Sequence, residues 1–145
     1  AAVAAAVHLR ESGRTRCCLL TTPDARTDLE ENGISVVDEG ADAVVVGGAG
    51  GALTCERLNR AFRLLMEGAD VIALEKDRYW MGGDGPVLSA GPVVAAVEYA
   101  AGIEAEVIGK PSPAFFQRAL QGIGARPLET AMRSSPISVV RVAAV

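Results

Sequence analysis

The pattern of apolar and polar positions predicts several helices in this chain. The alanine-rich opening favours a helix over residues 1–12 that stops at Gly13. Thr54 is a natural N-cap, and apolar residues follow it at the i, i+3, i+4 and i+7 spacing of one helix face. These apolar residues are Leu58, Ala61, Phe62 and Leu65. Three further helices are predicted: one that begins at Pro23, one that begins at Gly91-Pro92, and one from Ser112 to about Leu120.

Short runs of β-branched and other apolar residues between these helices predict strands. They cover residues 17–21, 34–37, 43–46, 70–74 and 106–109. The stretch 78–88 contains Gly-Gly-Asp-Gly-Pro at 82–86, which suits a hairpin or an exposed loop. Because strands and helices alternate, the pattern predicts an α/β layered fold around a largely buried sheet.

Composition and charge exclude several classes of function. The 14 basic and 18 acidic residues are mixed along the chain, so no basic stripe can follow a nucleic-acid backbone. The first apolar segment breaks at His8 and Arg10, far short of the roughly 20 apolar residues of a membrane span. The cysteines Cys17, Cys18 and Cys55 match neither a disulfide framework nor a zinc motif. We expect small buried thiols, a cytoplasmic location, and neither nucleic acid nor membrane as a partner.

Lys110 is the first candidate for chemistry. It directly follows the predicted strand 106–109 and precedes the helix predicted from Ser112. Ligands of open α/β sheets bind at the carboxyl edge, where an ammonium group can neutralise a phosphate and keep a nearby carboxylate ionised. Spacing alone favours the alternative of a surface lysine beside a turn.

The sequence around Lys110 resembles a motif of a known protein family. The segment 107–116, Val-Ile-Gly-Lys-Pro-Ser-Pro-Ala-Phe-Phe, looks like the third motif of haloacid-dehalogenase-type phosphatases with a large α/β cap, the NagD-like or nitrophenylphosphatase group. Segments 56–65, 72–74 with 78–80, and 91–100 are similar to that family in order and spacing. The resemblance is greatest to the branch that contains phospholysine phosphohistidine inorganic pyrophosphate phosphatase.

The resemblance implies a domain division and a reaction. Residues 1–104 would form an α/β cap with a mixed sheet and flanking helices, and residues 105–145 would be a fragment of a Rossmann-like catalytic core. Such enzymes hydrolyse small phosphorylated substrates, among them phosphate monoesters, phosphoamidates and pyrophosphate, with an aspartate nucleophile and Mg²⁺. Of the family's catalytic residues, only the lysine of the third motif carries over, and it falls on Lys110.

The chain also departs from the family pattern. The nucleophile motif Asp-x-Asp-Gly-Thr does not occur in the 145 residues, and after Met132 the chain reads Arg-Ser-Ser-Pro in place of a Gly-Asp-Asp type metal motif. We therefore expect no metal ligands in this chain, no phosphatase activity of the chain alone, and a parent protein with a segment upstream of residue 1.

Two residues are candidate substrate contacts. Asp84 lies in the glycine-rich stretch 82–86, where caps of this family reach over the active site, and Arg78 precedes it. The alternative for Asp84 is an exposed turn aspartate, which is favoured for its local hydrogen bonds. Tyr79-Trp80 is an aromatic pair that suits either the substrate pocket or a core or interface position.

Two functions of other classes stay open. One is a non-enzymatic cap that acts as an interaction module, with a homodimer formed through the cap surface. The other is a nucleotide-binding module that uses Gly47–Gly51, although this stretch lacks both Gly-x-Gly-x-x-Gly and a Gly-Lys-Ser/Thr ending.

Overall fold

The computed structural model describes residues 1–48, 50, 53–110, 132–134 and 138–140, and the structural statements below concern these residues. Their centre is a five-stranded parallel sheet with the strand order β2-β1-β3-β4-β7. Its strands are β1 (Arg16–Leu20), β2 (Ser35–Val36), β3 (Ala43–Val46), β4 (Asp70–Ala73) and β7 (Glu106–Val107). The predicted strands are therefore present, with the second and the last shorter than expected.

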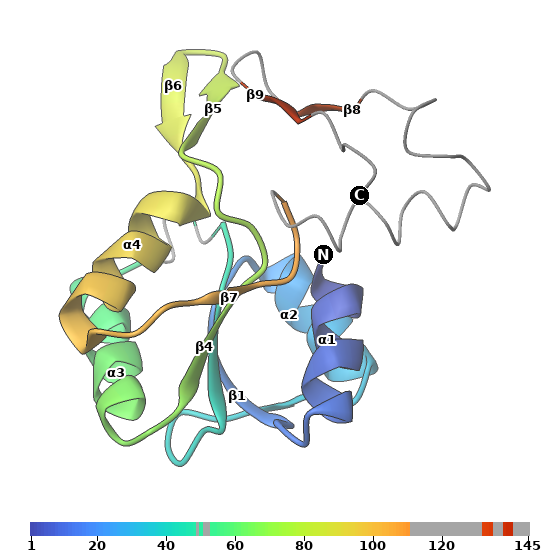
Figure 1. Cartoon of the computed structure of the whole chain (residues 1–145), viewed down its shortest axis with the longest axis vertical. Helices are drawn as coiled ribbons and strands as arrows, with labels where there is room; N and C mark the ends of the chain where they lie inside the picture. Colours follow the sequence, from blue (N-terminus) through green and yellow to red (C-terminus); the bar gives the residue numbers. More distant parts are fainter. Residues whose placement is uncertain (49, 51–52, 111–131, 135–137, 141–145) are drawn as a thin grey trace.

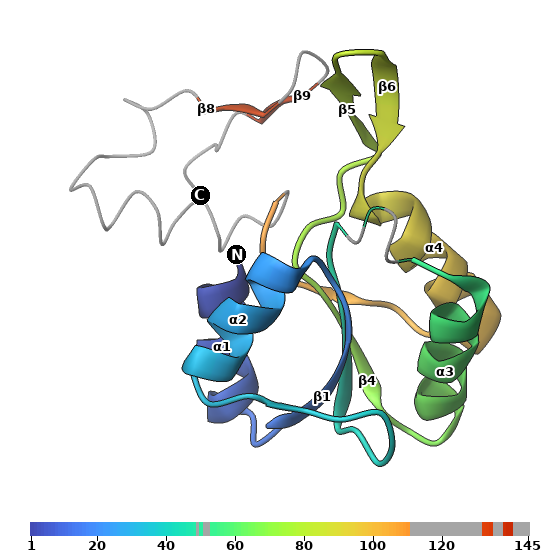
Figure 2. The same ribbon diagram turned by 180° about the vertical axis from the view of Figure 1, so that it is seen from behind.

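Four helices cover the two faces of this sheet in the described part of the chain. They are α1 (Ala2–Glu11), α2 (Pro23–Glu31), α3 (Cys55–Met66) and α4 (Ala90–Ala101). Helices α1 and α2 pack on one face and α3 and α4 on the other, as the two opposite views show (Figures 1 and 2). The sheet is the middle layer of three, which confirms the predicted α/β class.

The alternating side chains of β1 explain why both faces are apolar. Cys17 and Leu19 join the core beneath α1 and α2, whereas Cys18 and Leu20 join the core beneath α3 and α4. Successive strand residues point to opposite faces, and a parallel sheet with helices on both sides buries both sets. This explains the continuous apolar runs in the sequence.

Local signals in the sequence set the ends of the helices. The Thr54 hydroxyl accepts a hydrogen bond from the amide of Arg57 (3.2 Å), which confirms Thr54 as the N-cap of α3. Gly13 has φ of 75° just beyond α1, a left-handed conformation that glycine adopts without strain. The helix predicted from Ser112 to Leu120 lies outside the described residues.

Antiparallel strands form separate pairs in the described residues and are not part of the central sheet. β5 (Tyr79–Gly82) and β6 (Gly85–Leu88) make a hairpin between β4 and α4, and β8 (Met132–Ser134) pairs with β9 (Ser138–Val140). The sheet that we expected to be mixed is thus parallel. The β5–β6 hairpin projects beyond the carboxyl end of β4 (Figure 1).

Two expectations need comment. Cys17 and Cys18 are buried as predicted, but Cys55 is exposed at the first position of α3, so the expectation of a buried thiol there is wrong. The division of the chain at 104/105 stays a prediction; β7 follows that point directly and pairs with β4 in the same sheet as the preceding residues. None of the described helices is long and apolar enough to cross a membrane.

Candidate functional site at the carboxyl edge of the sheet

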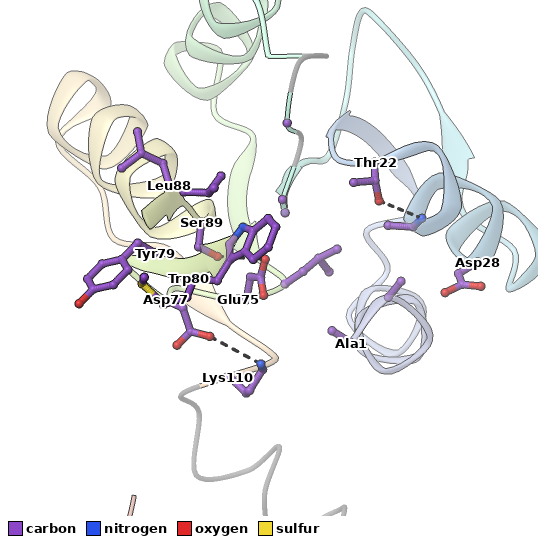
Figure 3. A pocket seen from close by; sticks show the side chains of 18 residues that line it. Ala1, Thr22, Asp28, Glu75, Asp77, Tyr79, Trp80, Leu88, Ser89 and Lys110 are labelled. Carbon is purple, nitrogen blue, oxygen red and sulfur yellow. Dashed lines mark hydrogen bonds and ion pairs between the residues drawn. The ribbon is translucent and has the colours of Figure 1, made fainter. Parts of the chain in front are cut away.

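A cavity of about 940 Å³ opens at the carboxyl edge of the sheet. Its walls come from the starts of α1 and α2, the glycine loop after β3, the segment after β4, the β5–β6 hairpin and Lys110 (Figure 3). Parallel strands all end at this edge, so segments far apart in the sequence meet here.

Lys110 lies at the cavity because backbone hydrogen bonds join its segment to the end of β4 and to the residues that follow β4. The amide of Ile108 donates to the Ala73 carbonyl (3.0 Å), and the amide of Lys76 donates to the Lys110 carbonyl (2.8 Å). The Lys110 ammonium lies 3.7 Å from a carboxylate oxygen of Asp77, and the Lys110 side chain is 40% exposed. Lys110 is therefore positioned at a strand-end cavity, and it is available to a ligand.

Two glycines in the loop after β3 make room for the floor of this cavity. A Cβ on Gly47 would stand 3.1 Å from the Leu74 side chain, and one on Gly48 would stand 3.2 Å from the carboxylate oxygen Oε1 of Glu75. The same Glu75 oxygen accepts a hydrogen bond from the Ser89 hydroxyl (3.4 Å). Glu75 is consequently held at the floor between the glycine loop and the start of α4.

The charged side chains around the cavity are mostly acidic. Asp28, Glu75 and Asp77 contribute three carboxylates, against the single ammonium of Lys110. These carboxylates do not form a metal centre, because the described residues contain no group of three or more ligating side chains that could hold a metal ion. The described residues therefore do not by themselves supply a site for the Mg²⁺ that the family resemblance implies.

The opposite wall of the cavity is apolar. It consists of Trp80, Met81, Val87 and Leu88 from the two strands of the hairpin, and all four are exposed. Trp80 is 53% exposed and Leu88 74% exposed, so this wall presents apolar surface to the cavity and to solvent. The cavity thus combines a charged floor with an apolar wall, as small-molecule sites commonly do.

The candidate residues identified from the sequence do not all lie at the cavity. Lys110 and Trp80 line the cavity, whereas Arg78 and Asp84 are exposed and are not among its lining residues. Asp84 occupies the turn between β5 and β6. The proposed contacts of Arg78 and Asp84 with substrate stay a prediction.

Sequence reasoning missed Asp28, Glu75 and Asp77. Glu75 and Asp77 follow β4 within four residues, so the same rule that selected Lys110 after its strand applies to them too. Asp28 carries no such signal, because it belongs to α2 and reaches the cavity only through the packing of that helix. Gly47, Gly48 and Gly50 line the same cavity, and the nucleotide-binding alternative stays untested.

Comparisons with known proteins extend these observations. A haloacid dehalogenase-like hydrolase domain-containing protein 2 from Bos taurus is 44% identical over 128 residues, which cover 88% of this chain and 48% of the relative. Human phospholysine phosphohistidine inorganic pyrophosphate phosphatase is 39% identical over 133 residues, or 90% of this chain and 47% of the relative. The chain thus spans about half the length of these relatives. No family model matches the chain.

The likeness extends to solved structures. The 4-nitrophenylphosphatase of Thermotoga maritima superposes with a TM-score of 0.77 at 34% identity, covering 87% of this chain and 49% of that chain. The resemblance to this phosphatase family is therefore confirmed in sequence, and the described part of the chain shares the fold.

Proposed function

From the relation of this chain, in sequence and fold, to the haloacid-dehalogenase-type phosphatases, we propose that it supplies the substrate-covering part of a Mg²⁺-dependent phosphatase for small phosphorylated substrates. In this proposal the cavity receives the substrate, and Lys110 contacts the phosphoryl group. The chain alone binds a phosphorylated compound and does not hydrolyse it.

The position of the Lys110 ammonium supports this proposal most directly. It combines the third-motif sequence at 107–116 with a place at the rim of a cavity on the carboxyl edge of the sheet. A positive charge there offsets the negative charge of a phosphoryl group, and its neighbour Asp77 keeps it close to the cavity in the absence of a ligand.

The nucleophile and the Mg²⁺ ligands are proposed to come from residues outside these 145. The chain contains no Asp-x-Asp sequence, and its described part offers no set of metal ligands. Mg²⁺, when bound in the complete site, would screen the charge of the phosphoryl group.

Binding of n-propyl phosphate to the full 145-residue chain tests the proposal. Trp80 is the only tryptophan and lines the cavity, so its fluorescence reports occupancy. Lys110→Ala should weaken binding about tenfold, because it removes the positive charge beside the phosphoryl group.

Arg63→Ala is the matched control. Arg63 also carries a positive charge, is exposed on α3, and is not among the cavity's lining residues. Equal affinities of the unmodified chain and the Lys110→Ala variant would contradict the proposed role of Lys110.

A further inference from the structure

We propose that Glu75 and Trp80 make this cavity selective for phosphorylated substrates whose leaving group carries a positive charge. The inference rests on the proposed function, in which the phosphoryl group lies at Lys110. It adds a substrate class, which is defined by the leaving group at the end of the substrate opposite its phosphoryl group.

The balance of charge in the cavity is the first argument. Asp77 is paired with Lys110, so those two charges largely offset each other. Glu75 and Asp28 make no ion pair with any of the described residues. The carboxylates of Glu75 and Asp28 outnumber the one α-ammonium of Ala1, which also lines the cavity, so the remaining lining is negative. A negative lining repels anionic leaving groups and attracts cationic ones.

The position of Glu75 is the second argument. Its carboxylate accepts the hydrogen bond from Ser89 and lies against Gly48, where even a methyl group would be a close contact. The carboxylate is thus held on the cavity floor without a cationic partner. A ligand ammonium group would supply that partner and leave the Ser89 hydrogen bond intact, because a carboxylate has acceptor capacity to spare.

The aromatic wall is the third argument. Trp80 leaves about half of its surface exposed, and it projects into the cavity from β5 together with Glu75 from the segment after β4 (Figure 3). The face of an indole ring attracts cations. A carboxylate and an indole in one cavity form a combination suited to an amine, with Lys110 left for the phosphoryl group.

A pair of matched ligands isolates this charge. O-Phosphoethanolamine and n-propyl phosphate have similar shapes but end in an ammonium and a methyl group, respectively. For the full chain, followed by Trp80 fluorescence, the ammonium ligand should bind about tenfold more tightly, from one partly exposed ion pair and one cation–π contact. The preference should shrink as ionic strength rises.

Glu75→Gln should bring the two affinities close together, because it keeps the shape of the side chain and removes its charge. Glu104→Gln is the control; Glu104 is exposed before β7 and does not line the cavity, so the preference should persist. Circular dichroism checks that both variants are folded.

The outcomes separate the two proposals. Equal affinities in the unmodified chain, or a preference that survives Glu75→Gln or is insensitive to salt, would overturn the selectivity while leaving phosphate binding by Lys110 in place. If n-propyl phosphate binds equally well to the Lys110→Ala variant, the proposed function fails. If neither phosphate binds, both proposals fail.

Discussion

Gly109 controls how closely the end of β7 approaches the end of β4. A Cβ at this position would overlap the backbone carbonyl oxygen of Leu74, and Gly109 is buried. Backbone atoms cannot rotate away as a flexible side chain can, so only glycine fits here. Lys110 follows directly, and its place at the cavity therefore depends on position 109 being a glycine, which has no side chain.

Gly109→Ala should destabilise the fold by about 2 kcal/mol, the typical cost of forcing extra volume into a packed site. It should also weaken n-propyl phosphate binding, because Lys110 moves with the displaced backbone. Urea unfolding and the Trp80 titration measure the two effects.

Gly83→Ala provides the comparison for this substitution. Nothing lies within 4 Å of a Cβ at Gly83, and its φ is not in the left-handed range, so stability should change by less than about 0.5 kcal/mol. A Gly109→Ala variant as stable as Gly83→Ala would show that β7 does not close on β4 in this way.

At the scale of elements, Glu98 fastens α4 to the strands that flank it. Its carboxylate accepts hydrogen bonds from the Lys76 ammonium, after β4, and from the backbone amide of Ala105, before β7 (both 2.7 Å). Partial burial raises the pKa of Glu98, but these two hydrogen bonds and the nearby charge of Lys76 outweigh it and lower the pKa. The segment that leads to Lys110 is thus anchored from α4.

Glu98→Gln should lower the free energy of unfolding by about 2 kcal/mol at pH 7, the scale of hydrogen bonds to a charged group. Because folding lowers the pKa, the contribution is present above the ordinary value of 4.5 and is lost as pH falls through the folded-state value. The difference between the two proteins should therefore shrink below about pH 4.5, as urea unfolding at several pH values would show. A difference that does not change between pH 7 and pH 3 would contradict the role of the charge.

On the scale of the whole molecule, the layers of the fold direct the chemistry to one edge. Helices bury both faces of the sheet, so the carboxyl ends of the strands and the hairpin beyond them are left to form a cavity. The exposed apolar side chains of the hairpin gather at that cavity as well. The homodimer expected through the cap surface stays a prediction.

The 145-residue chain should not hydrolyse 4-nitrophenyl phosphate at any Mg²⁺ concentration, because Lys110 alone supplies neither a nucleophile nor a metal site. Release of nitrophenolate, followed by absorbance, measures this. A version extended upstream to include an Asp-x-Asp motif, and with a Gly-Asp-Asp type motif in place of the residues after Met132, should gain activity, and that activity should need Lys110. Magnesium-dependent turnover by the 145 residues alone would contradict the division of labour proposed here.

The sequence by itself determined the α/β class, the helix-end signals at Thr54 and Gly13, and the position of Lys110 shortly after a strand. These features depend on local physics: side-chain periodicity, the hydroxyl of Thr54, and the conformational freedom of Gly13. The resemblance of residues 107–116 to a phosphatase motif is likewise contained in a short contiguous stretch of sequence.

Only the tertiary structure decided which side chains meet Lys110. Asp28 belongs to α2 and Trp80 to β5, and their distances along the chain from Lys110 do not predict that they share one cavity with it. The exposure of Cys55 and the place of Asp84 away from the cavity were also settled by packing. The physical reason is that a site at a strand edge is assembled by sheet order and helix packing, which are properties of contacts between distant residues.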